Sequence, residues 1–435
     1  MEHIQDWFNE KFIPATMKLS EMKYLKALRD GMIVAVPITF IGSIFLIITN
    51  LPILGWSDVI APFSAQLNVM SSVTIGITGL VMAIGLGYQV SKLNEIDPLS
   101  GTAIVVICYI IAMLNGKYEI DPGQWGSGGI FTAIIVSIVA AEIMRFFYKH
   151  KITIKLPSSV PPAVFNSFAA LIPASVAILI IWFVRVGLNI DMNAIINSMF
   201  APLVVGLNSI WGVLIMSFLT CLLWMFGIHG NNAIGWVATP VWTAALTANM
   251  EAFAAGKEIP NIVCDGFGNF GMNIGGTGAI MGLSICMMFF SRSKRYKTLG
   301  KIAFPPSIFQ ISEPIMFGFP VVLNPIIAIP FIAAPLILQG MSYILMNMGL
   351  IGHVVASVPW TCPPIINGFL LTGGDWRAAL WSGIQVVLAV LIYFPFFKVC
   401  DRQALKEEQE DAAKDAIENE AANGAIFDQK EEIYG

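Results

Sequence analysis

Residues 31–49 read G-M-I-V-A-V-P-I-T-F-I-G-S-I-F-L-I-I-T and contain no charged side chain. A helix needs roughly 20 predominantly apolar residues to cross the hydrocarbon core of a bilayer. The stretch therefore predicts a membrane-spanning helix over residues 30–49. We expect no cleavable signal peptide, because the residues before this stretch are polar and of mixed charge and the stretch itself is long enough to span.

The composition of the whole chain points the same way. Of 435 residues, 56% are hydrophobic and 12% are charged, whereas soluble proteins carry about 25% charged residues. Residues 1–30 and 401–435 hold 25 of the 52 charges, which leaves 27 for the 370 residues between them. The sequence thus predicts an all-α polytopic membrane protein solvated by lipid. A net charge of −4 excludes a basic nucleic-acid binder, so no nucleic-acid partner is expected.

Ten apolar stretches are long enough to be predicted spans. Two further stretches, 303–320 and 354–374, are short and dense in Pro and Gly. We interpret them as re-entrant hairpins, because irregular backbone at membrane depth is tolerated only where it is buried in protein or lines a cavity. The predicted spans are 30–49, 71–91, 98–114, 128–148, 166–188, 205–228, 233–250, 275–291, 321–346 and 377–398.

The distribution of basic residues sets the orientation. With the N-terminus inside and ten spans, 20 of the 24 Lys and Arg residues fall on the inner side. Cytoplasmic loops carry an excess of these residues, so both termini are predicted to be cytoplasmic. Each predicted hairpin enters and leaves on the same side of the membrane, so it does not change the side on which the later loops lie. The distribution of basic residues therefore does not test the hairpins.

Within the apolar region, the polar residues concentrate in the C-terminal half. We therefore divide the chain into two halves near residue 190. Apolar residues such as Ile195 and Met199 suggest an amphipathic helix lying in the membrane plane. The predicted organisation is a cytoplasmic segment 1–29, a scaffold domain 30–189, an in-plane connector 190–204, a ligand-binding membrane domain 205–400 and an acidic cytoplasmic tail 401–435.

Glu313 is the only ionisable residue in 304–320, which read F-P-P-S-I-F-Q-I-S-E-P-I-M-F-G-F-P. A carboxylate at bilayer depth costs about 2.5–3.5 kcal/mol even on the lenient insertion scale. Such a residue usually faces a cavity or a partner, so we favour a functional role. The alternative is a structural cap, since a Glu before Pro can accept hydrogen bonds at a helix start.

His229 ends the sixth predicted span and is followed by Gly230, Asn231 and Asn232. This cluster of donors and acceptors favours a polar ligand site, although a lone His in an apolar setting is often a satisfied core residue. Trp224 lies five residues before His229, and an indole face packs well on the apolar face of a sugar ring. Trp360 and Trp376 are further candidates, with an interfacial aromatic belt or plain core as the alternative.

Residues 268–278 read G-N-F-G-M-N-I-G-G-T-G, a pattern that permits close backbone approach. Helix packing and a ligand-lining turn are equally open interpretations. If the turn lines a ligand, its contributors are Gly276 and Thr277, with Gln310 and Ser312 beside Glu313. The G-x-G-x-x-G match at 266–271 follows no predicted strand, so a nucleotide fold is rejected. The six Cys form no C-x-x-C pair, and neither a metal nor a cofactor is expected.

A basic loop at 292–301, R-S-K-R-Y-K-T-L-G-K, immediately precedes the Glu313 segment. It is either a determinant of orientation or a docking site for an acidic or phosphorylated partner. The docking candidates are Arg292, Lys294, Arg295, Lys297 and Lys301.

Four of these segments resemble a known family. They are W-M-F-G-I-H-G-N-N-A at 224–233, G-G-T-G-A at 275–279, S-I-F-Q-I-S-E-P-I-M-F-G-F-P at 307–320 and G-G-D-W-R at 373–377. They resemble the membrane component, enzyme IIC, of the bacterial phosphotransferase system, in its lactose, cellobiose and diacetylchitobiose branch. The resemblance extends over about residues 5–400.

The resemblance implies a multi-pass protein of the bacterial plasma membrane with ten spans and two hairpins, which forms a homodimer through its N-terminal half. Its partners would be membrane lipid, a disaccharide and a separate cytoplasmic IIB protein, which carries phosphate on a cysteine and transfers it to the sugar 6-hydroxyl. Diacetylchitobiose or cellobiose is favoured over lactose. Glu313 would accept a hydrogen bond or the proton of that hydroxyl, and His229 would orient it or stabilise charge. Asn231 and Asn232 would read ring hydroxyls, and Trp224 would stack on the sugar.

Two other classes of function remain open on the residues alone. An ion-coupled secondary transporter would also use a membrane-embedded carboxylate, broken helices and a site at mid-membrane, and would release unmodified sugar. A scaffold or receptor without transport would leave the isolated polar cluster unexplained.

Overall fold

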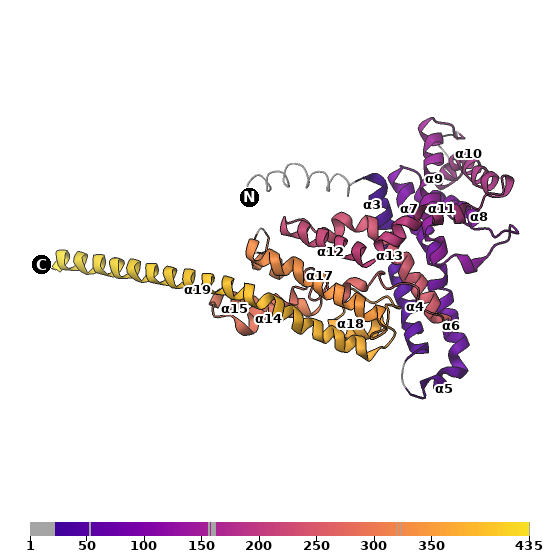
Figure 1. Ribbon diagram of the computed structural model, residues 1–435. Coiled ribbons are helices and arrows are strands. Elements are labelled where there is room, and N and C mark those ends of the chain that lie inside the picture. The colour runs from indigo at the N-terminus through magenta and orange to yellow at the C-terminus, as the bar shows by residue number, and fades with distance from the viewer. Residues whose placement is uncertain are drawn as a thin grey trace.

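Figure 1 shows the computed structural model of the chain. The structure describes residues 22–51, 54–154, 157, 162–319, 321–322 and 324–434. Side chains of 162–165, 167, 236 and 414–434 are outside this description. Most of the predicted cytoplasmic segment 1–29 therefore lies outside the described residues.

The N-terminal half is a helical bundle around one apolar core. Capping fixes the start of one of its helices, since the Asp97 carboxylate accepts hydrogen bonds from the hydroxyl (2.7 Å) and the N–H (2.9 Å) of Ser100. These bonds lower the pKa of Asp97. The helices are α3 (Lys23–Met32), α4 (Ala35–Thr49), α5 (Trp56–Ile60), α6 (Ser64–Ser72), α7 (Thr78–Leu93), α8 (Pro98–Ala112), α9 (Ile130–Lys149) and α10 (Pro162–Trp182).

The segment predicted to be an in-plane connector is helical, and its position in the membrane plane stays a prediction. Helix α11 (Met192–Leu207) begins at Asp191, whose carboxylate accepts the N–H of Ala194. It meets α12 (Ile210–Met225) at an angle of 72°. The chain therefore changes direction between α11 and α12.

The C-terminal half contains the interrupted helices. A second apolar core joins α12, α14, α17 and α19, which lie along one another in Figure 1. The described helices of this half are α13 (Gly230–Ala254), α14 (Met281–Phe290), α15 (Lys294–Ile308), α16 (Glu313–Gly318), α17 (Pro325–Asn347), α18 (Pro364–Leu371) and α19 (Trp376–Tyr434).

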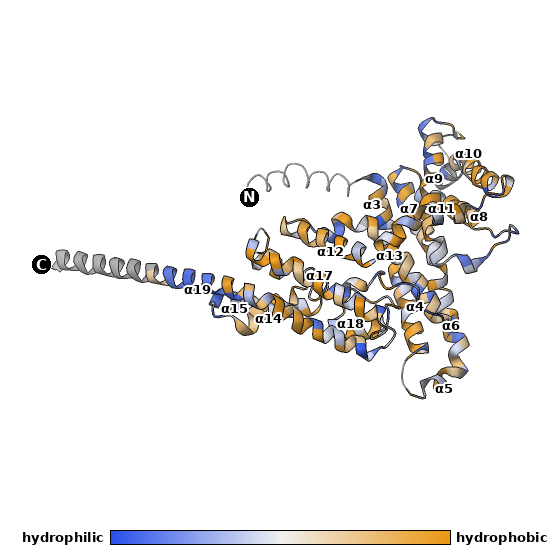
Figure 2. Cartoon of the chain, viewed as in Figure 1, coloured by the Kyte–Doolittle hydropathy of each residue, from blue (hydrophilic) through white to orange (hydrophobic). Residues whose placement is uncertain are grey.

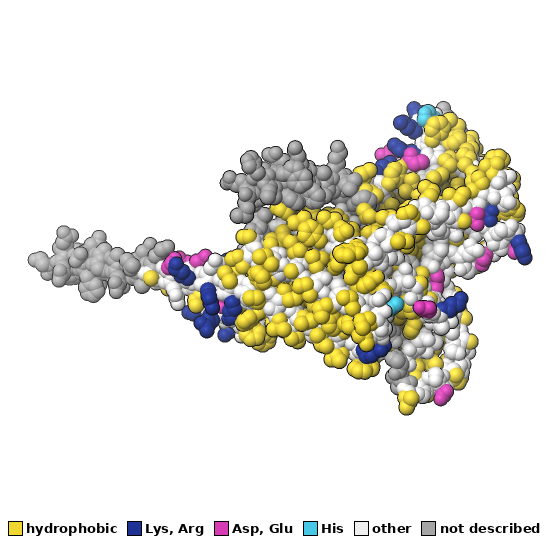
Figure 3. All heavy atoms as spheres, viewed as in Figure 1, with side chains coloured by type: hydrophobic (Ala, Val, Ile, Leu, Met, Phe, Trp, Pro, Cys, Tyr) yellow, Lys and Arg dark blue, Asp and Glu magenta, His cyan; other side chains and the backbone are white. Residues whose placement is uncertain are grey.

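The apolar exterior identifies a membrane protein. Hydrophobic residues make up much of the helices (Figure 2), and hydrophobic side chains cover much of the visible face of the helical body (Figure 3). Many large ones, such as Val205, Trp211 and Phe289, are exposed. Within the described residues, six helices are long and apolar enough to span, or seven if α11 and α12 form one bent span. Of the other predicted spans, 98–114 and 275–291 correspond to the shorter helices α8 and α14, and 233–250 falls within α13. The multi-pass fold is confirmed, whereas the count of ten stays a prediction.

Both predicted hairpins are interrupted helical segments. The first consists of the end of α15, a turn at 309–312 and the short α16. The second contains irregular chain before α18 and a turn before α19, where Gly373 and Gly374 have φ of +70° and +102°. Their position relative to a bilayer stays a prediction.

Direct contacts tie the two halves together. The N–H of Ser357 donates to Ser43 Oγ of α4 at 2.7 Å. The N–H and hydroxyl of Ser127 donate to the Glu251 carboxylate of α13 at 2.8 and 2.5 Å. Helix α13 also contributes apolar side chains to the N-terminal core. The N-terminal half therefore supports the helix that begins beside His229.

We predict that Arg185→Leu destabilises the protein by about 2–4 kcal/mol. Arg185 is 2% exposed and donates to the carbonyls of Leu114 (2.8 and 3.2 Å) and Asn115 (2.8 Å). The substitution leaves the half-buried Leu114 carbonyl without a donor among the described residues and removes one of the two donors of the Asn115 carbonyl, which keeps the N–H of Tyr118. Denaturant unfolding of the purified protein measures the effect. The exposed Arg377, paired with Asp375, is the matched control, and Arg377→Leu should cost about 1 kcal/mol or less; equal losses would contradict the prediction.

Candidate functional site

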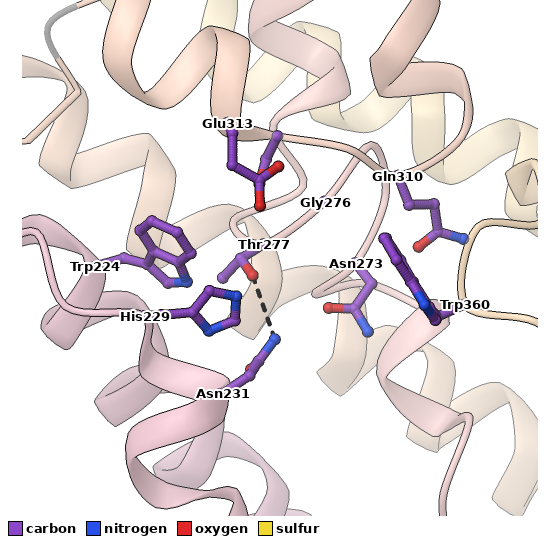
Figure 4. Close-up of a pocket in the computed structure, with 10 residues that line it drawn as sticks. Trp224, His229, Asn231, Asn273, Gly276, Thr277, Gln310, Glu313 and Trp360 are labelled. Carbon is purple, nitrogen blue, oxygen red and sulfur yellow. Dashed lines mark hydrogen bonds between the residues drawn. The ribbon is translucent and has the colours of Figure 1, made fainter. Parts of the chain in front are cut away.

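Four separate segments of the C-terminal half enclose a cavity of about 250 Å³. Figure 4 shows that their side chains converge on one space. The lining residues are Trp224, His229 and Asn231 from the α12–α13 junction; Asn273, Gly276 and Thr277 from the glycine-rich segment; Gln310, Ser312 and Glu313 from the first hairpin; and Trp360 from the second.

His229 reaches the cavity because the chain breaks between α12 and α13. Gly227, with φ of +78°, follows the end of α12, and His229 is the N-cap residue of α13. Its Nδ1 accepts the N–H of Asn232 at 3.4 Å. A neutral imidazole that accepts at Nδ1 carries its proton on Nε2. The ring therefore has a donor left for a ligand.

Glu313 is the first residue of α16 and its side chain is exposed. Among the described residues its carboxylate has neither a hydrogen bond nor an ion pair, and no side-chain cap is formed at this helix start. The capping alternative therefore has no contact to support it. Figure 4 shows the carboxylate directed toward Thr277 and His229.

The glycine-rich segment packs tightly and lines the cavity at the same time. Gly276 has φ of +103°, and a Cβ at this position would lie 2.5 Å from Ser312 Cβ. Next to it, Thr277 Oγ1 accepts a hydrogen bond from Asn231 Nδ2 at 3.5 Å. Close packing and the lining of a ligand cavity, the two interpretations of the glycines, therefore apply to the same turn.

Gln310 joins the two hairpins. Its backbone has φ of +62°, and its Nε2 donates to the Cys362 carbonyl at 2.7 Å. This bond holds the segment of Trp360 against the turn that precedes Glu313. The lining of the cavity is therefore fixed by contacts between the hairpins.

The tryptophans differ from one another in exposure. Trp224 is 3% exposed and its ring packs on His229 with centroids 4.7 Å apart. Its buried Nε1 has no hydrogen-bond partner within the described part of the chain. Trp360 is 66% exposed and lines the cavity. Trp376 is 65% exposed at the start of α19 and lines neither this cavity nor its neighbour, so the structure does not bring it to the site.

Two polar residues depart from the predicted set. Asn232 lines a neighbouring cavity rather than this one, while Asn231 lines both. Asn273 lines both cavities and was not predicted as a site residue. It belongs to the glycine-rich segment. The sequence feature that could have identified it is an amide side chain among glycines.

The five basic residues of the 292–301 loop are all exposed and gather beside the C-terminal part of α19 (Figure 3). Carboxylates of α19 hold the loop by its backbone. Asp401 accepts the N–H groups of Arg292 (3.0 and 3.1 Å) and Ser293 (3.1 Å), and Glu408 accepts those of Lys294 (3.0 Å) and Arg295 (2.9 Å). The basic side chains are left to face solvent at the start of α15, the helix that leads to Glu313.

Known proteins are similar to this chain in sequence and in fold. A family model described as "Phosphotransferase system, EIIC" matches residues 29–335. The lichenan permease IIC component of Bacillus subtilis (strain 168) is 37% identical, over 94% of this chain and 96% of its own length. The cellobiose-specific EIIC component of the Geobacillus stearothermophilus PTS is 35% identical, over 94% of this chain and 97% of its own length. The crystal structure of the transporter ChbC, the IIC component from the N,N'-diacetylchitobiose-specific phosphotransferase system, matches with a TM-score of 0.85 and 34% identity, covering 93% of this chain and 99% of that one.

An all-helical membrane domain whose broken helices bring a carboxylate and an imidazole to one polar cavity defines a membrane permease. This chain belongs to the EIIC family of the phosphotransferase system, in the branch that includes the lactose and cellobiose components. The resemblance drawn from the four motifs is confirmed. The protein is thus a multi-pass membrane component of a sugar phosphotransferase rather than an ion-coupled transporter or a receptor.

We predict that Gly276→Ala lowers sugar phosphorylation at least tenfold, because a Cβ 2.5 Å from Ser312 Cβ must displace the turn before Glu313. Sugar phosphate formed by reconstituted protein measures this. Gly349→Ala is the control: Gly349 also has positive φ, +69°, but nothing within 4 Å of the added Cβ. It should lose about 1 kcal/mol of stability and keep its activity; an equal loss of activity would show that backbone strain alone is responsible.

Proposed function

We propose that this EIIC protein translocates a β-linked disaccharide and presents its 6-hydroxyl to a phosphorylated IIB protein. Diacetylchitobiose or cellobiose is favoured, with lactose as the third candidate, because related proteins are named for lichenan, cellobiose, lactose and diacetylchitobiose. The observation that carries the proposal is the cavity shared by Glu313 and His229.

The chemistry requires a positioned hydroxyl and a proton acceptor. In the transfer, the bond between phosphorus and the IIB cysteine sulfur breaks as a bond between phosphorus and sugar O6 forms. Glu313 accepts the hydroxyl proton or holds it by a hydrogen bond. His229 donates through Nε2, orients the hydroxyl and stabilises the charge that develops on it.

The other lining groups suit a sugar ring. Asn231, Asn273 and Thr277 supply amide and hydroxyl groups that match ring hydroxyls, with Gly276 allowing close approach. Gln310 and Ser312 form the opposite wall beside Glu313. Trp360 offers its exposed indole face for stacking, and Trp224 lines the cavity beside His229 as the second candidate for stacking. Asn232 reads hydroxyls from the neighbouring cavity.

We also propose the remaining features of the assembly. Ten segments span the bacterial plasma membrane with two re-entrant hairpins, and both termini are cytoplasmic. The N-terminal half, residues 30–189, forms a homodimer. Phosphorylated IIB docks on the exposed basic side chains of the 292–301 loop, where opposite charge favours association.

We predict that Glu313→Gln lowers phosphorylation by about 10²–10⁴-fold, the usual contribution of a general base, because the amide cannot take up a proton. Production of sugar 6-phosphate from purified phospho-IIB measures the rate with cellobiose and diacetylchitobiose in proteoliposomes. Calorimetry should find the affinity for sugar within severalfold. Glu258→Gln, at an exposed position, is the control. Full phosphorylation by Glu313→Gln would contradict the role of Glu313 as base but not its role in binding.

We predict that Lys297→Glu with Lys301→Glu raises the KM for phospho-IIB by about tenfold at low salt, because it reverses charge on the docking surface. The rate at saturating phospho-IIB and the affinity for sugar should change little. Lys257→Glu, on the predicted outer side, serves as the control. An unchanged KM across the salt series would show that the loop only determines orientation.

A further inference from the structure

Asp401 of α19 is a buried carboxylate whose partners lie at the start of the 292–301 loop. It is 1% exposed and accepts the Ser291 hydroxyl at 2.6 Å. It also accepts the N–H of Arg292 at 3.0 and 3.1 Å and that of Ser293 at 3.1 Å. A buried carboxylate requires such partners, because its desolvation is costly without them. The loop and this part of α19 therefore depend on each other.

Glu408 holds the next residues of the same loop. It lies about two helical turns beyond Asp401 on α19. Its carboxylate accepts the Ser293 hydroxyl at 2.6 Å and the N–H groups of Lys294 (3.0 Å) and Arg295 (2.9 Å). These N–H groups open α15 and have no acceptor within their own helix, and negative charge is favourable at a helix N-terminus. Glu408 therefore caps α15 from a neighbouring helix.

The capped end of α15 also lies against the end of α16. The rings of Tyr296 and Phe319 have centroids 4.5 Å apart, and the Phe397 ring of α19 lies 6.4 and 6.5 Å from them. Nearby, the backbone of Gly318 comes so close to α15 that an added Cβ would lie 2.6 Å from Leu299 Cδ1. Helices α15 and α16 therefore form two arms, and α19 holds their open ends together.

Glu313 lies at the other end of these two arms, directly after the turn at 309–312. Its carboxylate has no hydrogen bond within the described residues, so the backbone of the hairpin sets its place in the cavity. A displacement of about 1 Å at a reacting group can lower a rate by roughly 10²-fold. The open ends of the arms are thus a place from which the position of Glu313 is controlled at a distance from the cavity.

We propose that Asp401 and Glu408 are positioning residues for the phosphoryl transfer. They fix the open ends of α15 and α16 and thereby hold Glu313 at the cavity. Neither residue lines this cavity or its neighbour, so both act through the hairpin rather than on the substrate. This inference rests on the proposed function and adds to it two residues outside the site.

Glu408→Ala and Asp401→Asn test the proposal. Glu408→Ala removes the cap at a half-buried position. Asp401→Asn keeps the shape of the side chain and one acceptor oxygen, but it places an NH₂ group against an N–H donor. The matched control is Glu410→Ala, because Glu410 is an exposed carboxylate of α19 whose ion pair, with Lys406 at 3.6 Å, lies within its own helix.

Phosphorylation assays with purified phospho-IIB in proteoliposomes separate kcat from KM. We expect both variants to lower kcat by roughly tenfold or more, because the Glu313 turn is no longer held in place. The affinity for cellobiose or diacetylchitobiose, measured by calorimetry, should stay within severalfold. The KM for phospho-IIB should not rise, because the basic side chains remain and a negative charge beside them is removed. Glu410→Ala should keep the wild-type kcat.

A double-mutant cycle shows whether the two carboxylates act through Glu313. In a Glu313→Gln background, Glu408→Ala should leave the remaining rate nearly unchanged, because substitutions that act on one group are not additive. Hydrogen exchange provides a local readout of the cap. The amides of Lys294 and Arg295 should exchange roughly tenfold faster or more in Glu408→Ala than in wild type, since they lose their acceptor.

Three results would overturn the proposal. One is an unchanged kcat in both variants despite faster amide exchange, and another is an equal fall in rate with and without Glu313→Gln. The third is a fall in kcat that is matched by a loss of sugar binding, which would indicate a general loss of structure. In each case, sugar 6-phosphate formed by wild-type protein leaves the proposed function intact, whereas no sugar phosphate from wild type would reject both.

Discussion

The site depends on the meeting of helix interruptions in one place. Backbone groups that leave a helix inside a membrane domain need partners within the protein, because lipid supplies none. Here the interruptions supply partners to one another. The Gln310 side chain donates to the Cys362 carbonyl of the second hairpin, and Asn231 of the α12–α13 break donates to Thr277 of the glycine-rich turn. Removal of any one segment would leave polar groups of the others unpaired, so the cavity and the fold of this half are stabilised together.

One helix connects the site with the exposed basic loop. Helix α15 begins in the basic loop and ends immediately before Gln310 and Glu313. Its first N–H groups are held by Glu408 of α19, and the buried Ser284 and Ser307 hydroxyls lie 2.9 Å apart where α15 packs on α14. A partner that binds the loop therefore binds the same rigid element that positions the Glu313 turn. The proposed docking surface and the proposed site for chemistry are therefore linked by α15.

The strongest predictions from sequence came from isolated residues in an unfavourable setting. Glu313 and His229 were predicted because an ionisable group in an apolar stretch has few structural explanations, and both line the cavity. Trp376 was a weaker candidate, since an exposed indole and a cavity-lining indole look alike in sequence. Asn273 was not identified because an asparagine beside glycines is also typical of an ordinary turn. The number of spans can be predicted only partly from the length and composition of the apolar stretches. Two of the stretches predicted to span form the short helices α8 and α14.

The arrangement of the aromatic side chains could not be predicted from the sequence and became clear only in the structure. Sequence spacing placed Trp224 near His229, and the two rings are indeed in contact. His229 packs against the Trp224 ring, and Trp224 also lines the cavity, so its stacking on a ligand stays a prediction. Trp360 comes from a hairpin more than a hundred residues away, and the Gln310–Cys362 bond brings its segment to the cavity. The position of Trp360 at the cavity is therefore set by a contact between hairpins, which no local pattern in the sequence encodes.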